Sequence, residues 1–313
     1  MGFSKGTKRD SEISITRYIG IAAVKILALN PNAEQQNKLF NTQAFTENPV
    51  YTGKGKAKNS KGEDIEAPQI RLNFVVATNP KIACNNGIEM TSNISFFITK
   101  AYQYSHKNGI DKIKVIDEFG RTAWATSEEL KNKAVPVYAN GPARISNNYR
   151  PCYIGEEEVI NFLKTYLGIP APEVWNAQTE KFVQRPAAEL EDCKASLTNI
   201  EKYFNGDVSE LKEILTYQPE NMIKVLFGVR TADDGKQYQT VFTRKFLSVA
   251  STNLNGIKNE LSNAQQAGAY STTAFEVCDL KEFNIQATDY SKDTDADDFN
   301  QTPSDDLPFG GVE

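Results

Sequence analysis

The chain has 313 residues, of which 24% are charged and 40% hydrophobic, and its formal net charge at pH 7 is -5. Such a composition is typical of a globular protein and excludes collagen, a coiled coil and wholesale disorder. No apolar run approaches the roughly 20 residues of a membrane-spanning helix, and the N-terminus lacks the apolar core of a secretory signal, so we expect a cytoplasmic protein without membrane contact.

The predicted elements begin after a polar segment, residues 1–12, which we expect to be flexible. Alternating or β-branched apolar residues predict strands over residues 14–29, 69–78, 94–100, 112–116, 222–230, 238–249 and 272–285. Apolar residues at helical spacing predict helices over residues 32–40, 156–167, 187–204, 208–215 and 253–266. The order of elements predicts an α+β fold, with one folded domain over residues 13–287 and a helical insertion at about 155–220.

Charge is distributed unevenly along the chain. Residues 288–313 contain eight acidic residues and one lysine, a net charge of -7, and few apolar residues, so we expect a disordered acidic tail. Residues 1–62 contain ten basic and four acidic residues, a net charge of +6, whereas residues 155–220 contain 13 acidic and six basic residues. A basic body with an acidic tail suits a protein that binds a polyanion, and solubility is the alternative explanation of the tail.

Signatures of catalysis and metal binding are weak. The chain has one histidine, His106, and neither a Gly-x-Gly-x-x-Gly motif nor a Walker loop. We therefore expect no enzyme, no cofactor and no metal; an acidic pair in the body, Asp117 and Glu118, is where an enzyme hypothesis would start. The cysteines are far apart in sequence, which predicts buried free thiols rather than disulfides or a zinc site: Cys84, Cys152, Cys193 and Cys278.

Basic and aromatic residues are interleaved in several segments. Residues 52–62 contain four lysines, three glycines and no acidic residue, which predicts a flexible basic loop that either binds phosphates or is merely solvated. A protein that binds single strands needs cations along the phosphates and exposed rings on which bases stack, although any one ring can equally belong to the core. The candidate DNA-binding residues are Lys54, Lys56, Lys58, Lys61, Arg71, Tyr102, Tyr104, Arg121, Trp124, Tyr149, Arg150, Tyr238, Phe242 and Arg244.

The end of the chain carries the sharpest motif, formed by Asp305, Asp306, Leu307, Pro308 and Phe309. It resembles the tail tip of bacterial-type single-stranded-DNA-binding proteins, in which acidic residues precede an apolar-Pro-Phe end. The resemblance implies that these five side chains bind replication or recombination proteins. In that family the phenylalanine ends the chain, whereas here residues 310–313 follow it, so the implication covers the side chains and not a terminal carboxylate.

The whole plan is similar to larger phage replication proteins that coat single strands. This likeness implies an OB-like antiparallel β-barrel core with helical insertions, a disordered acidic C-terminal tail and, for a phage-encoded protein, the host cytoplasm. Our leading hypothesis is non-sequence-specific binding and protection of single-stranded DNA in replication, recombination or repair, with the tail recruiting partner enzymes. The alternatives are a structural or virion-associated protein with a solubilising tail, and a strand-annealing recombination mediator.

Overall fold

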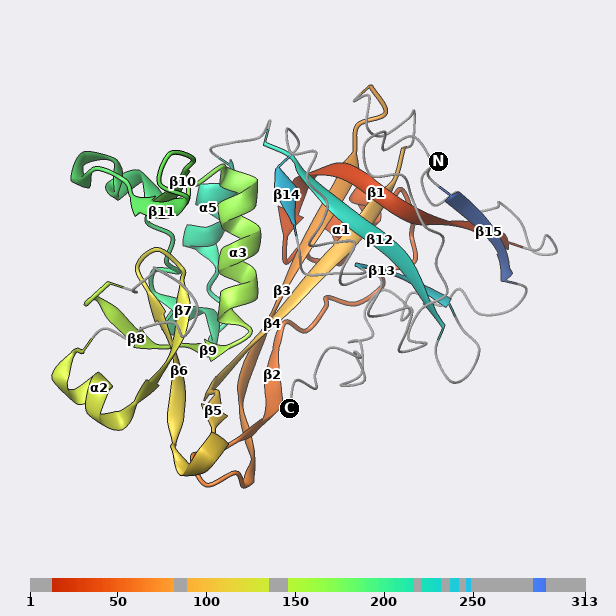
Figure 1. The fold of residues 1–313 in the computed structure, drawn as a ribbon. Coiled ribbons are helices and arrows are strands. Elements are labelled where there is room, and N and C mark those ends of the chain that lie inside the picture. The colour runs from red at the N-terminus through yellow and green to blue at the C-terminus, as the bar shows by residue number, and fades with distance from the viewer. Residues whose placement is uncertain are drawn as a thin grey trace. The chain divides into compact units, whose positions relative to one another are not determined.

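A computed structural model describes residues 13–81, 89–134, 146–216, 221–231, 237–241, 246–248 and 284–290. In this part of the chain strands predominate and the helices are short, which makes the protein a mixed α/β structure with antiparallel sheets (Figure 1). The strands are β1 (Ile13–Leu29), β2 (Thr52–Lys58), β3 (Asp64–Thr78), β4 (Thr91–Tyr102), β5 (Tyr104–Ser105), β6 (Lys112–Asp117), β7 (Thr122–Thr126), β8 (Tyr149–Pro151), β9 (Tyr153–Ile154), β10 (Glu173–Asn176), β11 (Lys181–Gln184), β12 (Ile223–Thr231), β13 (Gln237–Val241), β14 (Leu247–Ser248) and β15 (Asn284–Tyr290). The helices are α1 (Ala33–Leu39), α2 (Ser127–Asn132), α3 (Glu156–Leu167), α4 (Ile200–Tyr203) and α5 (Ser209–Thr216), with 3-10 turns η2 (Lys107–Gly109), η3 (Ala187–Glu189) and η4 (Glu191–Cys193).

The chain divides into two units, each assembled from separate segments. Unit 1 comprises residues 1–50, 73–94 and 218–313, and unit 2 comprises residues 51–72 and 95–217. In unit 1 the long strand β1 pairs antiparallel with β12, with β15 and with the second half of β3. The predicted first strand and the predicted helix after it are confirmed, and Asn32 caps α1 with a complete capping box, as its sequence position indicates.

Unit 2 contains the helical segment and the candidate site. β2 pairs with the first half of β3, and β4 pairs with β9. A smaller sheet has the order β5-β6-β7, and β8 pairs with the end of β6, from Val115 to Asp117. The predicted helix over residues 156–167 is confirmed as α3, and Gly168 ends it in the left-handed conformation. The apolar stripe of α3 packs on the sheet, where the ring centroids of Phe96 and Phe162 are 5.0 Å apart.

The junction between β9 and α3 is held by two adjacent residues. Gly155 has a φ of 82°, and a Cβ atom there would lie 1.8 Å from the carbonyl oxygen of Phe97. Glu156 is fully buried, and its carboxylate pairs with the Arg150 guanidinium and accepts a 3.0 Å hydrogen bond from the Tyr153 N–H. The backbone contact at Gly155 and the buried ion pair of Glu156 together hold β8, β9 and α3 against β4.

Two stretches of unit 2 differ from the sequence-based prediction. The helix expected over residues 187–204 is wrong, because only η3, η4 and the four residues of α4 are helical there. Ser, Thr and Asn between residues 196 and 199 favour local turns over helix, and Asn199 adopts a left-handed φ of 52°. The hairpin of β10 and β11 was not predicted. The predicted helix over residues 253–266 and most of the predicted strand over residues 272–285 lie outside the described residues.

We predict that Gly155→Ala destabilises the protein far more than Gly168→Ala. Both glycines have positive φ, which costs a side chain about 1–2 kcal/mol, but a Cβ atom meets nothing within 4 Å at Gly168. Urea unfolding should show a loss of about 1 kcal/mol for Gly168→Ala and of at least about 3 kcal/mol for Gly155→Ala, which adds the collision with Phe97. Equal losses of unfolding free energy in the two variants would contradict the close contact between Gly155 and Phe97.

Candidate nucleic-acid interface

The lysine-rich segment forms a hairpin with the next strand, so the prediction of a flexible loop over residues 52–62 is wrong. β2 pairs with β3 along its whole length, from Thr52 opposite Ile70 to Lys58 opposite Asp64. Side chains alternate along a strand, which places Lys54, Lys56 and Lys58 together on one exposed side. Lys61 lies in the turn that joins the two strands.

Small residues explain why this polar segment is a strand. On the side opposite the lysines, Ala57 packs with Ala67 of β3 and Ala101 of β4 in a small buried cluster. A Cβ atom at Gly55 would lie 2.4 Å from the Gln69 amide, which itself donates a 2.9 Å hydrogen bond to Thr99. The alternation of lysine with glycine or alanine is therefore a strand pattern, in which the small residues allow close packing.

Acidic residues across the hairpin balance most of the lysine charge. The Lys54 ammonium lies 3.2 Å from the Glu66 carboxylate, and the Lys58 ammonium lies 3.5 Å from the Asp64 carboxylate. Residues 52–70 contain four lysines against three acidic residues (Glu63, Asp64 and Glu66), so their net charge is only +1. The strongly basic segment that the sequence indicates is thus a row of ion pairs.

The end of β4 adds a cation and an aromatic stack to the same side of the sheet. Because Ala101 packs on the alanine side, its neighbours Lys100 and Tyr102 project to the lysine side. The Tyr102 and Tyr153 rings stack with centroids 5.2 Å apart and planes 14° apart. We call this side the lysine face and define it by Lys54, Lys56, Lys58, Lys100 and Tyr102.

A third ring and a carboxylate complete the surroundings of Lys100. The Phe204 ring meets Tyr153 edge to face at 5.4 Å, and the Lys100 ammonium lies 5.7 Å from the Phe204 centroid. Glu201 pairs with Lys100 at 2.6 Å and accepts a 2.5 Å hydrogen bond from the Tyr153 hydroxyl. Hydrogen bonds from Lys100 and then Tyr153 lower the pKa of Glu201, whereas burial, followed by the bond to Glu201, raises the pKa of Tyr153.

Arg71 does not lie on an exposed surface, which argues against its prediction as a DNA-binding residue. β3 is buried on both sides from Ile70 to Val76, and Arg71 is only 9% exposed. Its Nε donates a 3.2 Å hydrogen bond to the Ser95 hydroxyl, and burial lowers its pKa. Arg71 is not part of the candidate interface, because its guanidinium is buried and bonded in the interior.

Tyr149 and Arg150 also have structural roles. The Tyr149 ring is 2% exposed, which corrects its prediction as a stacking residue, and its hydroxyl lies within hydrogen-bonding distance of the Glu129 and Ala134 carbonyl oxygens. Burial raises the pKa of this hydroxyl. The Arg150 guanidinium pairs with the buried carboxylate of Glu156, so it helps to hold the start of α3.

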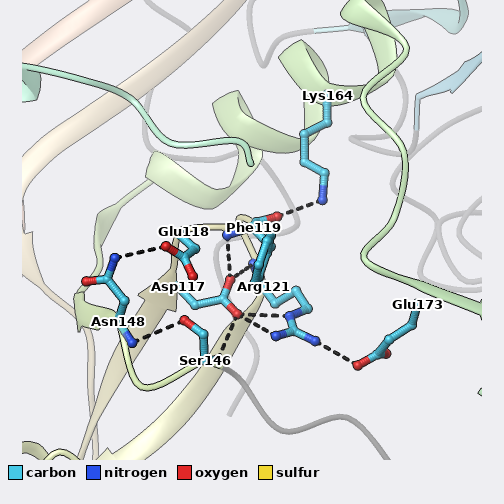
Figure 2. Close-up of polar contacts among 8 residues, drawn as sticks. All are labelled: Asp117, Glu118, Phe119, Arg121, Ser146, Asn148, Lys164 and Glu173. Carbon is cyan, nitrogen blue, oxygen red and sulfur yellow. Dashed lines mark hydrogen bonds and ion pairs between the residues drawn. The ribbon is translucent and has the colours of Figure 1, made fainter. Parts of the chain in front are cut away.

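Arg121 belongs to a turn that Figure 2 shows in detail. The Asp117 carboxylate accepts hydrogen bonds from the N–H groups of Phe119 at 3.0 Å and Arg121 at 2.9 Å. The Arg121 guanidinium lies between Asp117, at 2.8 Å, and Glu173, at 2.7 Å. Asp117 and Arg121 therefore hold the turn and the start of β10, and the Asn148 amide donates a hydrogen bond to Glu118.

The remaining candidate residues fall into two groups. Tyr104 on β5 is half-buried and Trp124 on β7 is 37% exposed, so both rings are partly accessible in unit 2. Tyr238 lies in β13, opposite Arg230, but its side chain is not described. Phe242, Arg244 and the five tail residues from Asp305 to Phe309 lie outside the described residues.

Sequence reasoning missed several aromatic residues near the surface. The half-buried Tyr153 and the buried Phe204 lie beside the lysine face but are distant from it in sequence. In the β10–β11 hairpin, Trp175 and Phe182 face each other with ring centroids 5.2 Å apart and are 56% and 50% exposed. The hairpin was signalled by two short apolar runs flanking a polar turn at residues 177–180.

Comparison with known proteins gives no family assignment. No protein-family model, curated protein or solved structure matches the chain. Within the described ranges, none of the helices has the length and apolar character needed to cross a bilayer, and no three histidine, cysteine or acidic side chains gather as metal ligands. The prediction of buried free thiols is confirmed for Cys152 and Cys193, and burial raises the pKa of Cys152 to about 12.

We predict that Arg121→Gln lowers stability and leaves the affinity for any oligonucleotide that the chain binds unchanged. The substitution leaves the fully buried Asp117 carboxylate without its cation, which should cost about 2–4 kcal/mol in urea unfolding. Lys54→Gln removes an exposed pair and should cost less than about 1 kcal/mol. If the variant is as stable as the wild type but binds an oligonucleotide more weakly, Arg121 belongs to the interface.

Proposed function

We propose that the chain binds single-stranded DNA without sequence preference and protects it during replication, recombination or repair. The observation that carries the proposal is the lysine face, where cations on β2 and β4 share one side of a sheet with the Tyr102–Tyr153 stack. Alternate residues of a strand are about 7 Å apart, so Lys54, Lys56 and Lys58 form a row of cations suited to a phosphate backbone.

The chemistry of this face supports binding that tolerates any sequence. Ammonium groups attract phosphates irrespective of the base, and every base offers a flat surface to an aromatic ring, worth about 1–3 kcal/mol per stack. Side chains that read base edges in a fixed pattern, such as paired amides, are not among the five residues that define the lysine face. The proposal includes no catalytic step and no cofactor.

The finer parts of the proposal concern the fold and the tail. Unit 2, with its antiparallel strands and packed helix α3, is compatible with an OB-like barrel, a fold that binds single strands across its sheet. The residues from Asp305 to Phe309 lie outside the described part, so recruitment of replication or recombination proteins remains a prediction from the resemblance of the tail.

Fluorescence titration with oligo-dT at two salt concentrations tests the proposal, with a duplex of equal length as the comparison. We expect tight, salt-sensitive binding to the single strand and quenching of tyrosine and tryptophan emission, because bases stack on exposed rings. No binding at low salt would overturn the proposal in favour of a structural protein. Faster pairing of complementary strands would favour the strand-annealing alternative.

We predict that changing Lys54, Lys56, Lys58 and Lys61 together to Ala weakens binding to all single strands equally. Each lost phosphate contact should flatten the dependence of log K on log salt by about 0.7, so the slope should change by up to about 3. The control variant removes four exposed lysines from other elements: Lys38, Lys131, Lys181 and Lys212. A slope that is the same in the hairpin variant and the wild type would exclude the hairpin from the interface.

A further inference from the structure

Three cations of the lysine face are each held by a carboxylate of unit 2. Lys54 pairs with Glu66, Lys58 with Asp64, and Lys100 with Glu201, at 3.2, 3.5 and 2.6 Å. All six side chains are between 42% and 89% exposed. Ion pairs this exposed are weak, because water and salt compete with them. Each lysine can therefore exchange its carboxylate for another anion at little cost.

The surroundings of Glu201 match those of a bound phosphate most closely. Its carboxylate accepts hydrogen bonds from the Lys100 ammonium and the Tyr153 hydroxyl, beside the ring stack that would hold a base. An ammonium and a hydroxyl donating to one anionic group are the donors that phosphate oxygens commonly take in nucleic-acid complexes. The hydrogen bonds keep the pKa of Glu201 low, so the group stays anionic.

The ion pairs that hold Arg121 and Arg150 differ from the three on the lysine face, because their carboxylates are buried. Asp117 and Glu156, which hold Arg121 and Arg150, have fully buried side chains. A buried carboxylate that loses its cation is left uncompensated in the interior, so those pairs cannot open for a ligand. The exposed carboxylates of Glu66, Asp64 and Glu201, by contrast, can release their lysines into water.

On the basis of the proposed function, we infer that Glu66, Asp64 and Glu201 are internal substitutes for DNA phosphates. In the free protein they hold the lysines in place, and the phosphates of a single strand replace them when DNA binds. Binding is then an exchange of anions, and each carboxylate lowers the affinity for DNA.

The first experiment removes the three carboxylates together, as Glu66→Gln, Asp64→Asn and Glu201→Gln, and measures oligo-dT binding at two salt concentrations. We expect about two- to fivefold tighter binding per carboxylate, about tenfold or more in total, and a steeper salt dependence. A control variant changes net charge equally at exposed glutamates elsewhere in unit 2, Glu128→Gln, Glu180→Gln and Glu213→Gln, and should gain less than about twofold. Circular dichroism checks that both variants are folded.

A double-mutant cycle separates exchange from simple repulsion between carboxylate and DNA. If Glu201 acts by holding Lys100, the gain from Glu201→Gln disappears in a Lys100→Met background. If Glu201→Gln still raises the affinity for oligo-dT in that background, the inference is wrong. It is also wrong if the wild type binds oligo-dT and the triple variant binds no more tightly. Either result leaves the proposed function unaffected. A wild-type protein that does not bind oligo-dT overturns both.

Discussion

The packing of three alanines determines which way the lysines of β2 point. Ala57, Ala67 and Ala101 come from three strands and meet on one side of the sheet. Because side chains alternate, this contact orients every lysine of β2, and Lys100 and Tyr102 of β4, to the opposite side. A shift of β2 by one residue would bury lysines against β4 and expose the small residues. The charge arrangement of unit 2 thus depends on an apolar contact that carries no charge itself.

Local sequence patterns predicted the elements that are stabilised locally. The β-branched run of β1, the capping box at Asn32 and the stripe of α3 with its final Gly168 are each complete within one segment, and the structure confirms them. The helix predicted over residues 187–204 failed because the Ser, Thr and Asn residues within it favour local turns, and Asn199 adopts a left-handed φ. The prediction of a flexible loop over residues 52–62 failed because it rested on their polar composition and overlooked the alternation of lysine with glycine or alanine.

The residue types of the candidate site were predicted from the sequence, but their spatial arrangement was not. The lysines were recognised, yet their carboxylate partners depend on the register of β2 with β3, which composition cannot supply. Arg71 and Tyr149 look accessible in their segments, but neighbouring strands and loops cover them in the folded chain. Tyr153, Phe204 and Glu201 could not be assigned, because only the fold brings them beside Lys100.

The exposure of the tryptophans has a spectroscopic consequence. The chain has two tryptophans, and both Trp124 and Trp175 are partly in contact with water in the folded state. An indole that is already hydrated changes its emission wavelength little when the chain unfolds, so intrinsic emission is a poor probe of global unfolding for this protein. The same indoles are open to collisional quenchers such as acrylamide, and Trp175→Phe would leave Trp124 as the single reporter, in the sheet of β5, β6 and β7.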